Sequence, residues 1–316
     1  MVLNSALVRN TLSCDTLMML FCKMLAQRPP TALLARSLAT SSSRLLEDKV
    51  IVVAGSGNPP DEGHGIGAMT SIVLARHGAK VVSVSNAALN AQTVTDAIIA
   101  EGGTAMAHVA DCTDASEVEK LVKATTDKYG KCDVLINAGI HSALPMGFSK
   151  MTEQAWGTGI ALNLTAHFNL VHKFLPVFQS QGSGNIIHFT TIASSVALGV
   201  GNQRHAYAAG KAGAAVLTKR IGVEHAKQGI RANVIGIGYV SGPLVNRAVA
   251  QAIAGGAKTT IEKVTATRDA YVPRGTQIMP EEVAEVAAFL ASDASAAING
   301  TEIYADGGSS GATYGP

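Results

Sequence analysis

Tyr207 and Lys211 are the residues of this chain best suited to acid–base chemistry. They stand four positions apart in the segment Tyr207-Ala208-Ala209-Gly210-Lys211. The apolar spacing around them predicts a helix, in which both side chains lie on one face. A phenol with a pKa of about 10 is a poor acid or base at neutral pH, but a neighbouring ammonium stabilises the phenolate. The pair is therefore a candidate proton carrier, and an ordinary helix face is the alternative interpretation.

A glycine-rich turn between a predicted strand and a predicted helix is the second feature with a chemical use. Residues 54–67 read Ala-Gly-Ser-Gly-Asn-Pro-Pro-Asp-Glu-Gly-His-Gly-Ile-Gly. Glycine lets the backbone approach a pyrophosphate, and the N-terminus of the next helix offers N–H groups and a partial positive charge. This placement indicates a dinucleotide site. Pro59-Pro60 would stiffen the turn, and Asp61-Glu62 would repel a pyrophosphate unless both point to solvent.

The elements that must position these residues alternate along the chain from Lys49 onward. Short β-branched runs predict strands at residues 50–53, 81–84, 134–136, 186–187 and 234–235. Helical spacing predicts helices at residues 65–76, 91–101, 115–129, 153–178, 205–227 and 281–291. Such alternation is typical of βαβ units. We therefore predict the α/β class, with a single doubly wound Rossmann-type domain, a parallel sheet and helices on both faces.

This domain is expected to span residues 47–316. Asp114 has the residue type of an N-cap, Gly78 follows the first helix as a stop signal, and Pro280 suits a first helical position. Residues 241–279 break the strand–helix rhythm. They are expected to form a lid over a substrate, or alternatively a packing subdomain.

The order of these motifs resembles that of the short-chain dehydrogenase/reductase family. Gly55, Gly65 and Gly67 look like the glycines of the family's Thr-Gly-x-x-x-Gly-x-Gly turn, in a loop that is six residues longer here. The Tyr-x-x-x-Lys pair follows a strand that ends in hydroxyls and precedes Ile230-Arg231-Ala232-Asn233. The resemblance covers residues 49–308.

The resemblance implies a catalytic group built on Tyr207 and Lys211. A hydroxyl that polarises the substrate carbonyl should complete it, and two residues compete for this role. Counting back from Tyr207 by the family's interval gives Ser194, whereas aligning the preceding strand gives Thr191. Asn163 matches the family's helix asparagine, which holds a water that connects Lys211 to solvent.

The resemblance also implies a nicotinamide cofactor. The expected contact residues are Gly55, His64, Gly65, Ile66, Gly67, Ser85, Asn86, Asp111, Cys112, Asn137, Ala138, Gly139, Tyr207, Lys211 and Val240. The second strand ends in Ser85-Asn86, where an acid would disfavour a 2′-phosphate. His64 stands where members that prefer NADP often have a basic residue. NADP(H) is therefore expected over NAD(H).

The implied reaction is hydride transfer between NADP(H) or NAD(H) and a carbonyl or alcohol, with tyrosine as proton donor or acceptor. An inactive nucleotide-binding or scaffold protein and an enoyl-type reductase are the alternatives. The irregular glycine loop and the shortened motif of residues 137–139 favour the scaffold. The small and apolar residues of 241–279 predict a hydrophobic small-molecule substrate. Family members are commonly homodimers or homotetramers, and the last helix with the strand around Ile303 is the expected contact.

Bulk properties narrow the partners and the location. A net charge of +2 gives no reason to expect nucleic acid or an anionic membrane. The four cysteines form no CxxC pair, so free thiols and no metal are expected. Residues 1–46 contain Asp15 as their single acid before Glu47 and end near a hydroxyl-rich stretch, which is the composition of a mitochondrial transit peptide. A cytoplasmic location is the alternative, and the apolar run of residues 17–21 is too short to span a bilayer.

Overall fold

The computed structural model describes residues 44–60, 63–139, 147–195, 204–256 and 258–312. The expected leader lies outside these residues except for positions 44–46. Cys14, Cys22 and the Asp61-Glu62 pair also lie outside them. The leader and the charges of the glycine loop therefore stay predictions.

Seven parallel strands form one sheet in the order β3-β2-β1-β4-β5-β6-β7. The strands are β1 (Val50–Ala54), β2 (Lys80–Ser85), β3 (Thr104–Val109), β4 (Val134–Asn137), β5 (Gly184–Thr191), β6 (Ile230–Ile237) and β7 (Glu302–Ala305). The predicted doubly wound sheet is confirmed. The strand order reverses between β1 and β4, which is where ligands bind in sheets of this kind.

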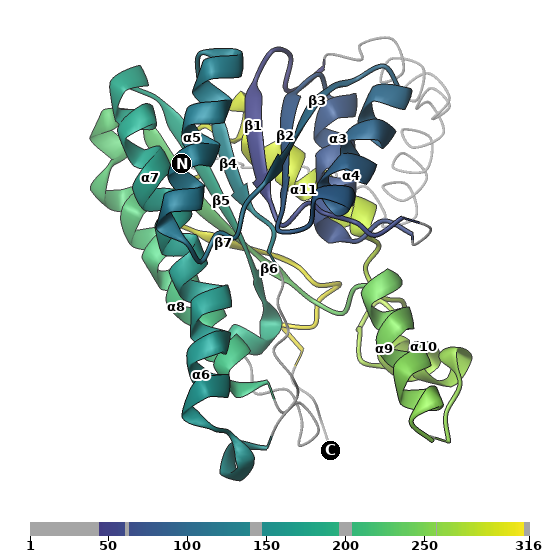
Figure 1. The fold of residues 1–316 in the computed structure, drawn as a ribbon. Coiled ribbons are helices and arrows are strands. Elements are labelled where there is room, and N and C mark those ends of the chain that lie inside the picture. The colour runs from purple at the N-terminus through teal and green to yellow at the C-terminus, as the bar shows by residue number, and fades with distance from the viewer. Residues whose placement is uncertain (1–43, 61–62, 140–146, 196–203, 257, 313–316) are drawn as a thin grey trace, which may run out of the picture. The chain divides into compact units, whose positions relative to one another are not determined.

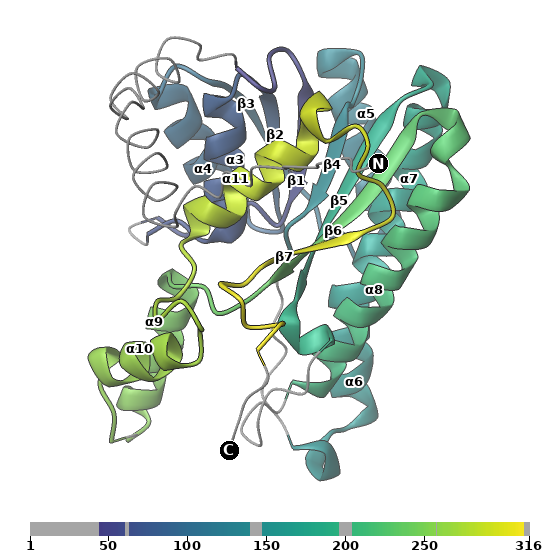
Figure 2. The same cartoon turned by 180° about the vertical axis from the view of Figure 1, so that it is seen from behind.

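The helices cover both faces of the sheet, as predicted. They are α3 (Ile66–Arg76), α4 (Ala88–Ala100), α5 (Ala115–Tyr129), α6 (Glu153–Ile160), α7 (Ala166–Gln181), α8 (His205–Glu224), α9 (Pro243–Ala254), α10 (Ile261–Ala270) and α11 (Pro280–Ala291). Helices α3, α4 and α11 lie on one face, and α5, α7 and α8 lie on the other (Figures 1 and 2). Alternate residues of β1 point into the two cores, so the whole strand is apolar and buried.

The predicted helix boundaries held at some ends and failed at others. Asp114 caps α5 by accepting a hydrogen bond from the Ser116 N–H, and Pro280 opens α11. The helix predicted over residues 153–178 is continuous in the structure, but a π-turn at Ala161–Thr165, which was not predicted, divides it into α6 and α7. A π-turn adds one residue to the helical repeat, which shifts the faces of the two helices relative to each other.

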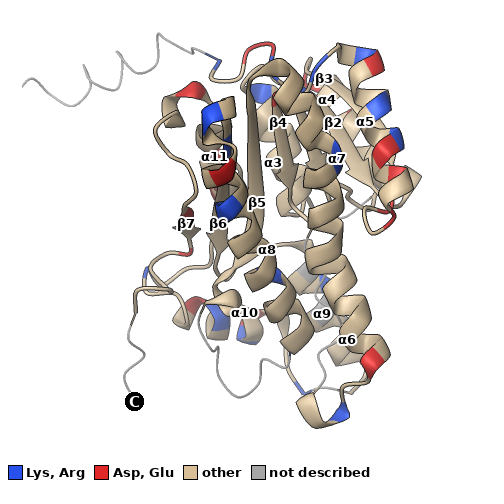
Figure 3. Ribbon diagram, turned by 90° about the vertical axis from the view of Figure 1, so that its left-hand side faces the viewer, with Lys and Arg blue, Asp and Glu red and all other residues tan. Residues whose placement is uncertain are grey.

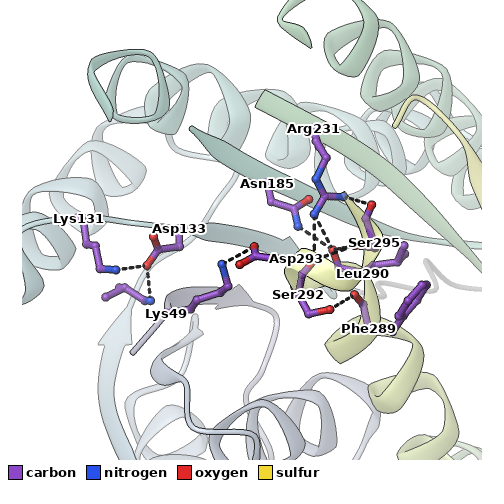
Figure 4. A network of polar contacts seen from close by, with 11 residues as sticks. Lys49, Lys131, Asp133, Asn185, Arg231, Phe289, Leu290, Ser292, Asp293 and Ser295 are labelled. Atoms are coloured by element: carbon purple, nitrogen blue, oxygen red, sulfur yellow. Dashed lines mark hydrogen bonds and ion pairs between the residues drawn. The ribbon is translucent and has the colours of Figure 1, made fainter. Parts of the chain in front are cut away.

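A polar network fixes α11 against the amino ends of β5 and β6 (Figure 4). The Arg231 guanidinium donates to the carbonyls of Leu290, Ser292, Ser295 and Ile298 at 3.1–3.3 Å. The Asn185 amide donates to the Leu290 carbonyl at 2.7 Å. These bonds join β5 and β6 to carbonyls at the C-terminal end of α11 and in the turn that follows it.

Charged side chains lie mainly on the outer faces of helices such as α5 and α11 (Figure 3). Among the described residues, Lys211 and Asp306 are the buried charged side chains. No helix in the described part of the chain combines the length and apolarity needed to cross a membrane. A buried lysine is rare, so the burial of Lys211 indicates that its amine has specific partners inside the fold.

Candidate active site

A cavity of about 760 Å³ lies at the carboxyl ends of the strands. Ala54, Ser85, Asn137, Thr191 and Ile237 all line it, and each is the last residue of its strand. The crevice therefore occupies the edge at which doubly wound sheets bind ligands. Of the predicted cofactor residues, all except His64 and Lys211 line this cavity.

The glycine turn has the backbone geometry that a pyrophosphate needs. Gly55 has φ of 82°, and a Cβ there would lie 2.5 Å from the Gly139 Cα. Gly67 packs directly on the Gly55 carbonyl. Helix α3 begins after Gly65, has no side-chain cap and carries no acid in its first turn. Its positive end therefore faces the cavity with no carboxylate in the first turn of the helix.

The longer glycine loop is held by Asn58, which sequence reasoning missed. This residue is 2% exposed, and its Oδ1 accepts a hydrogen bond from the Gly65 N–H at 3.1 Å. Its Nδ2 donates to the Pro59 carbonyl, and its own N–H donates to the Asn90 carbonyl. A polar residue inside the turn was the available signal. His64 does not line the cavity, and its charge acts on Glu101, so the structure does not bring it to the site.

Neutral groups and one acid form the end of the cavity beyond β2 and β3. Ser85 and Asn86 follow β2, with the Ser85 hydroxyl accepting a hydrogen bond from the Ala87 N–H. The Asp111 carboxylate accepts hydrogen bonds from the backbone and hydroxyl of Thr113. Burial raises the pKa of the Cys112 thiol to about 12, so this residue lines the cavity as an unreactive group.

Tyr207 and Thr191 meet at the opposite end of the cavity. Tyr207 is 6% exposed and lines the cavity together with Thr191. Burial raises the pKa of the Tyr207 phenol, whereas the Thr191 hydroxyl and the charge of Arg204 lower it. Ser194 does not line the cavity, because its hydroxyl donates to the Thr191 carbonyl at 2.6 Å and bonds the Thr190 hydroxyl at 3.1 Å. Of the two predicted hydroxyls, only Thr191 lies at the phenol.

Lys211 lies one helical turn beyond Tyr207 and beneath the cavity floor. Its Nζ donates to the Gly139 carbonyl at 2.6 Å and to the Phe189 carbonyl at 2.8 Å. Burial lowers the pKa of this amine to about 7. Gly139 also abuts Gly55, so one residue at the end of β4 contacts both the glycine turn and the lysine. The predicted phosphate turn and the predicted proton carrier therefore share one crevice.

Asn163 lies within the π-turn between α6 and α7. It is 1% exposed, and its Nδ2 donates to the Gly159 carbonyl at 2.9 Å. A Cβ at Gly210 would lie 2.8 Å from the Asn163 Cβ, so this asparagine packs on α8 next to Lys211. π-turns are frequent at functional sites because they change which residue faces inward.

A pair of buried histidines lies behind the catalytic group and was not predicted. His167 Nδ1 accepts from the Asn137 amide at 3.3 Å, and its Nε2 donates to the Thr218 hydroxyl at 2.8 Å. The ring of His188 lies 4.2 Å from that of His167. Burial lowers the pKa of His167 to about 3 and that of His188 well below its ordinary value. Both rings are therefore neutral neighbours of Lys211.

The region predicted as a lid contributes one wall of the cavity. Val245 and Val249 of α9 and Val264 of α10 line it. Val240 lines it as well and forms a parallel bridge with Ile278. Among the described residues, no group of three or more His, Cys, Asp or Glu side chains could hold a metal ion.

Comparison with known proteins identifies the relatives of this chain. The family profile described as Enoyl-(Acyl carrier protein) reductase matches residues 62–310. The 3-oxoacyl-[acyl-carrier-protein] reductase FabG of Thermotoga maritima is 32% identical, over 83% of this chain and 98% of the relative. A crystal structure of a short-chain dehydrogenase/reductase from Burkholderia xenovorans has a TM-score of 0.76 and 29% identity, covering 86% of this chain and 99% of that one. An actinorhodin polyketide ketoreductase solved with NADPH has a TM-score of 0.74 and 25% identity, covering 84% and 98%.

Proposed function

Because the chain belongs to the short-chain dehydrogenase/reductase family, we propose that Tyr207 exchanges the proton while Thr191 holds the substrate oxygen. The protein is an oxidoreductase that transfers a hydride between a nicotinamide cofactor and a carbonyl or alcohol substrate. The observation that carries the assignment is that Thr191 and Tyr207 line one cavity with the glycine turn, and that the Thr191 hydroxyl lowers the pKa of the phenol.

The cavity fits a dinucleotide, with the glycine turn and the open end of α3 suited to its pyrophosphate. When bound, the nicotinamide supplies or accepts the hydride. In reduction, Thr191 and Tyr207 both direct hydroxyls at the substrate oxygen, and Tyr207 gives up its proton to it. The ammonium form of Lys211 stabilises the resulting phenolate by its charge. Asn163, in the π-turn beside α8, is proposed to bind the water that links Lys211 to solvent.

Turnover assays with a conservative variant test this assignment. Purified enzyme with NADPH or NADH is screened against aliphatic, cyclic and aromatic ketones, beside Tyr207→Phe. We expect the variant to lose at least about 10³-fold in kcat, the upper part of the range for a general acid, with cofactor affinity unchanged. Full activity in Tyr207→Phe would refute the assignment.

We infer that NADP(H) is the preferred cofactor. Ser85 and Asn86 place neutral side chains with hydrogen-bond donors after β2, where a carboxylate would repel a 2′-phosphate. The related ketoreductase bound to NADPH supports the same choice. His64 adds nothing to it, because this residue does not line the cavity.

Reduction of a carbonyl is favoured over reduction of a double bond. The matching family profile carries the description of an enoyl reductase, whereas FabG and the polyketide enzyme are named for ketone reduction. A hydroxyl pair at the substrate oxygen serves an alkoxide that forms from a carbonyl. The contact between Thr191 and Tyr207 therefore supports carbonyl chemistry. The valines of α9 and α10 support a substrate with a hydrophobic body.

We further propose that the protein is a homo-oligomer that uses α11 and β7. Phe289 and Tyr304 on these elements are 39% and 38% exposed, which is high for large aromatic side chains. Light scattering of the purified protein measures the state, and Phe289→Glu should shift it toward the monomer. A monomeric wild type would refute the proposal.

We propose mitochondrial import for the leader, residues 1–46. Its support is compositional, because basic and hydroxyl side chains outnumber acids in this segment. A fusion of residues 1–46 to a fluorescent protein tests it in a eukaryotic cell. Fluorescence spread through the cytoplasm would refute the proposal.

A further inference from the structure

The substrate end of the cavity carries an excess of positive charge. Arg204, Arg247 and Arg268 line the cavity, whereas Asp111 is the acid among the described residues that line it. Asp111 follows β3 and its carboxylate is engaged by Thr113, so it does not offset the arginines. An excess of cations over acids in a cavity lining favours an anionic ligand.

Arg268 is held in a fixed orientation by neutral groups. Its Nε donates to the Gln277 Oε1 at 2.6 Å, and its Nη2 donates to the Val240 carbonyl at 2.9 Å. The guanidinium lies 5.1 Å from the centre of the Tyr239 ring. The neighbouring acid, Asp269, accepts hydrogen bonds from the backbone and side chain of Gln277. Arg268 thus presents a half-buried, preorganised charge without a carboxylate bonded to it.

Arg204 brings a second positive charge close to the reacting group. It precedes α8 at the N-cap position, three residues before Tyr207. Burial and the Thr191 hydrogen bond are the larger influences on the pKa of Tyr207, and Arg204 lowers that pKa through its charge. Burial lowers the pKa of Arg268, and the charge of Arg204 lowers it further. Arg204, Arg268 and Tyr207 all line the same cavity, so the charges of both arginines act in the space that the phenol also faces.

We propose that Arg204 and Arg268 together bind a carboxylate of the substrate, which makes the enzyme specific for an oxo acid or hydroxy acid with an apolar chain. This inference rests on the proposed function. Arginine pairs bind carboxylates by charge-assisted hydrogen bonds, which fix orientation as well as affinity. Because Arg204 precedes Tyr207 by three residues and both line the cavity, we place the carboxylate a few bonds from the reacting carbonyl. The phosphates of a pantetheine thioester are separated from that carbonyl by a long neutral arm, so they fit this position less well.

Paired substrates test the charge requirement. The 3-, 4- and 5-oxo forms of a medium-chain acid are compared with their methyl esters, using wild type, Arg204→Gln and Arg268→Gln. The control is Arg220→Gln, which removes an exposed charge from α8 outside the cavity. We expect kcat/KM for at least one acid to exceed that of its ester, and to fall about 10- to 100-fold in both test variants. The ester values should fall less than the acid values, but they should still change, because the charge of Arg204 also acts on the pKa of Tyr207. Both values should change less than about threefold in the control.

Equal turnover of acids and esters by the wild type would overturn the inference. An equal loss on both substrates in Arg204→Gln would also overturn it. Arg204 is exposed and makes no bond to a described residue, so we expect Arg204→Gln to fold. This variant alone decides the test if Arg268→Gln fails to fold. Acetoacetyl-coenzyme A and acetoacetate are compared in the same assay. If the wild type preferred the thioester and Arg204→Gln lost this preference, the arginines would bind a phosphate and the carboxylate assignment would be wrong.

A binding measurement separates this inference from the proposed function. Titration of hexanoate and hexanamide into the NADP⁺-saturated enzyme needs no turnover. Hexanoate should bind the wild type and Arg220→Gln with similar affinity. Its affinity for Arg204→Gln and Arg268→Gln should be at least about 10-fold lower, and hexanamide should bind all four proteins weakly. Arginine-dependent binding with no reduction of any ketone would leave the inference standing and refute the proposed function. Equal binding of hexanoate to all four proteins would refute the inference, whether or not ketones are reduced.

Discussion

Replacing Lys211 by methionine should change how the stability of the protein depends on pH. In the folded protein, burial lowers the pKa of this amine from 10.5 to about 7. The unfolded chain keeps the proton up to its ordinary pKa, so between these values the unfolded state binds more protons than the folded state. The free energy of unfolding of the wild type must therefore rise with pH across this window. Methionine keeps a similar length without a titrating group.

The expected size follows from the two pKa values. Below pH 7 the difference between 10.5 and about 7 corresponds to about 5 kcal/mol in favour of the unfolded state. Raising the pH from 6 to 9 should remove about 2–3 kcal/mol of that penalty. The variant also leaves the carbonyls of Gly139 and Phe189 without the Nζ donor, at about 1–3 kcal/mol each. That loss is independent of pH, so the change with pH in the free energy of unfolding reports only the titration of Lys211.

Equilibrium urea unfolding of both proteins at pH 6, 7, 8 and 9 measures the slope. The free energy of unfolding of the wild type minus that of Lys211→Met should increase by about 2–3 kcal/mol across this series. Parallel curves would show that Lys211 has the same pKa in both states, which refutes the buried amine. Turnover by the variant should be lost at every pH, because the phenolate of Tyr207 loses its stabilising charge.

Three further changes test other parts of the site and the fold. Thr191→Val should lower kcat/KM by about 10²-fold or more. Ser194→Ala should change kcat/KM less than about threefold, because the Ser194 hydroxyl is bonded to the Thr191 carbonyl. If Ser194→Ala had the larger effect, Ser194 would be the residue that holds the substrate oxygen. Asn86→Asp should shift the ratio of kcat/KM for NADPH over NADH by at least about tenfold toward NADH, since a carboxylate repels the 2′-phosphate, and an unchanged ratio would show that the 2′-phosphate binds elsewhere. Arg231→Met should lower the free energy of unfolding by about 2–4 kcal/mol, because the four hydrogen bonds of the guanidinium are lost. Arg220→Met, on an exposed face, should change it by less than about 0.5 kcal/mol, and equal effects would contradict the network.

The sheet could be predicted from the sequence because helices cover both of its faces. A strand such as β1 buries every residue, so it is a continuous apolar run in the sequence. The edge strand β3 is partly exposed along its length, and no apolar run marks it. The π-turn at Ala161–Thr165 escaped prediction for a different reason. Helical periodicity describes a repeat, and a single added residue does not interrupt the apolar pattern on either side.

The site divides in the same way between local and distant information. Tyr207 and Lys211 could be predicted because both lie on one helix and their spacing carries the geometry. Asn58 and His167 could not, since their roles depend on partners contributed by other parts of the chain. The choice between Thr191 and Ser194 also needed coordinates. Counting residues back from Tyr207 assumes a loop of fixed length, whereas the position of a strand end depends on the register of the sheet.

Register explains why a glycine loop of unusual length is compatible with this site. Ala54 of β1 pairs with Asn137 of β4, and Asn137 pairs with His188 of β5. These pairs fix the turn at Gly55 and the carbonyl of Gly139 relative to β5, whatever the length of the loops between them. After Gly55, the Asn58 side chain accepts a hydrogen bond from the Gly65 N–H and so ties the described start of the loop to the start of α3. The strand register therefore sets the position of Thr191 and of the Gly139 and Phe189 carbonyls that bind the Lys211 amine of α8, independently of the length of the glycine loop.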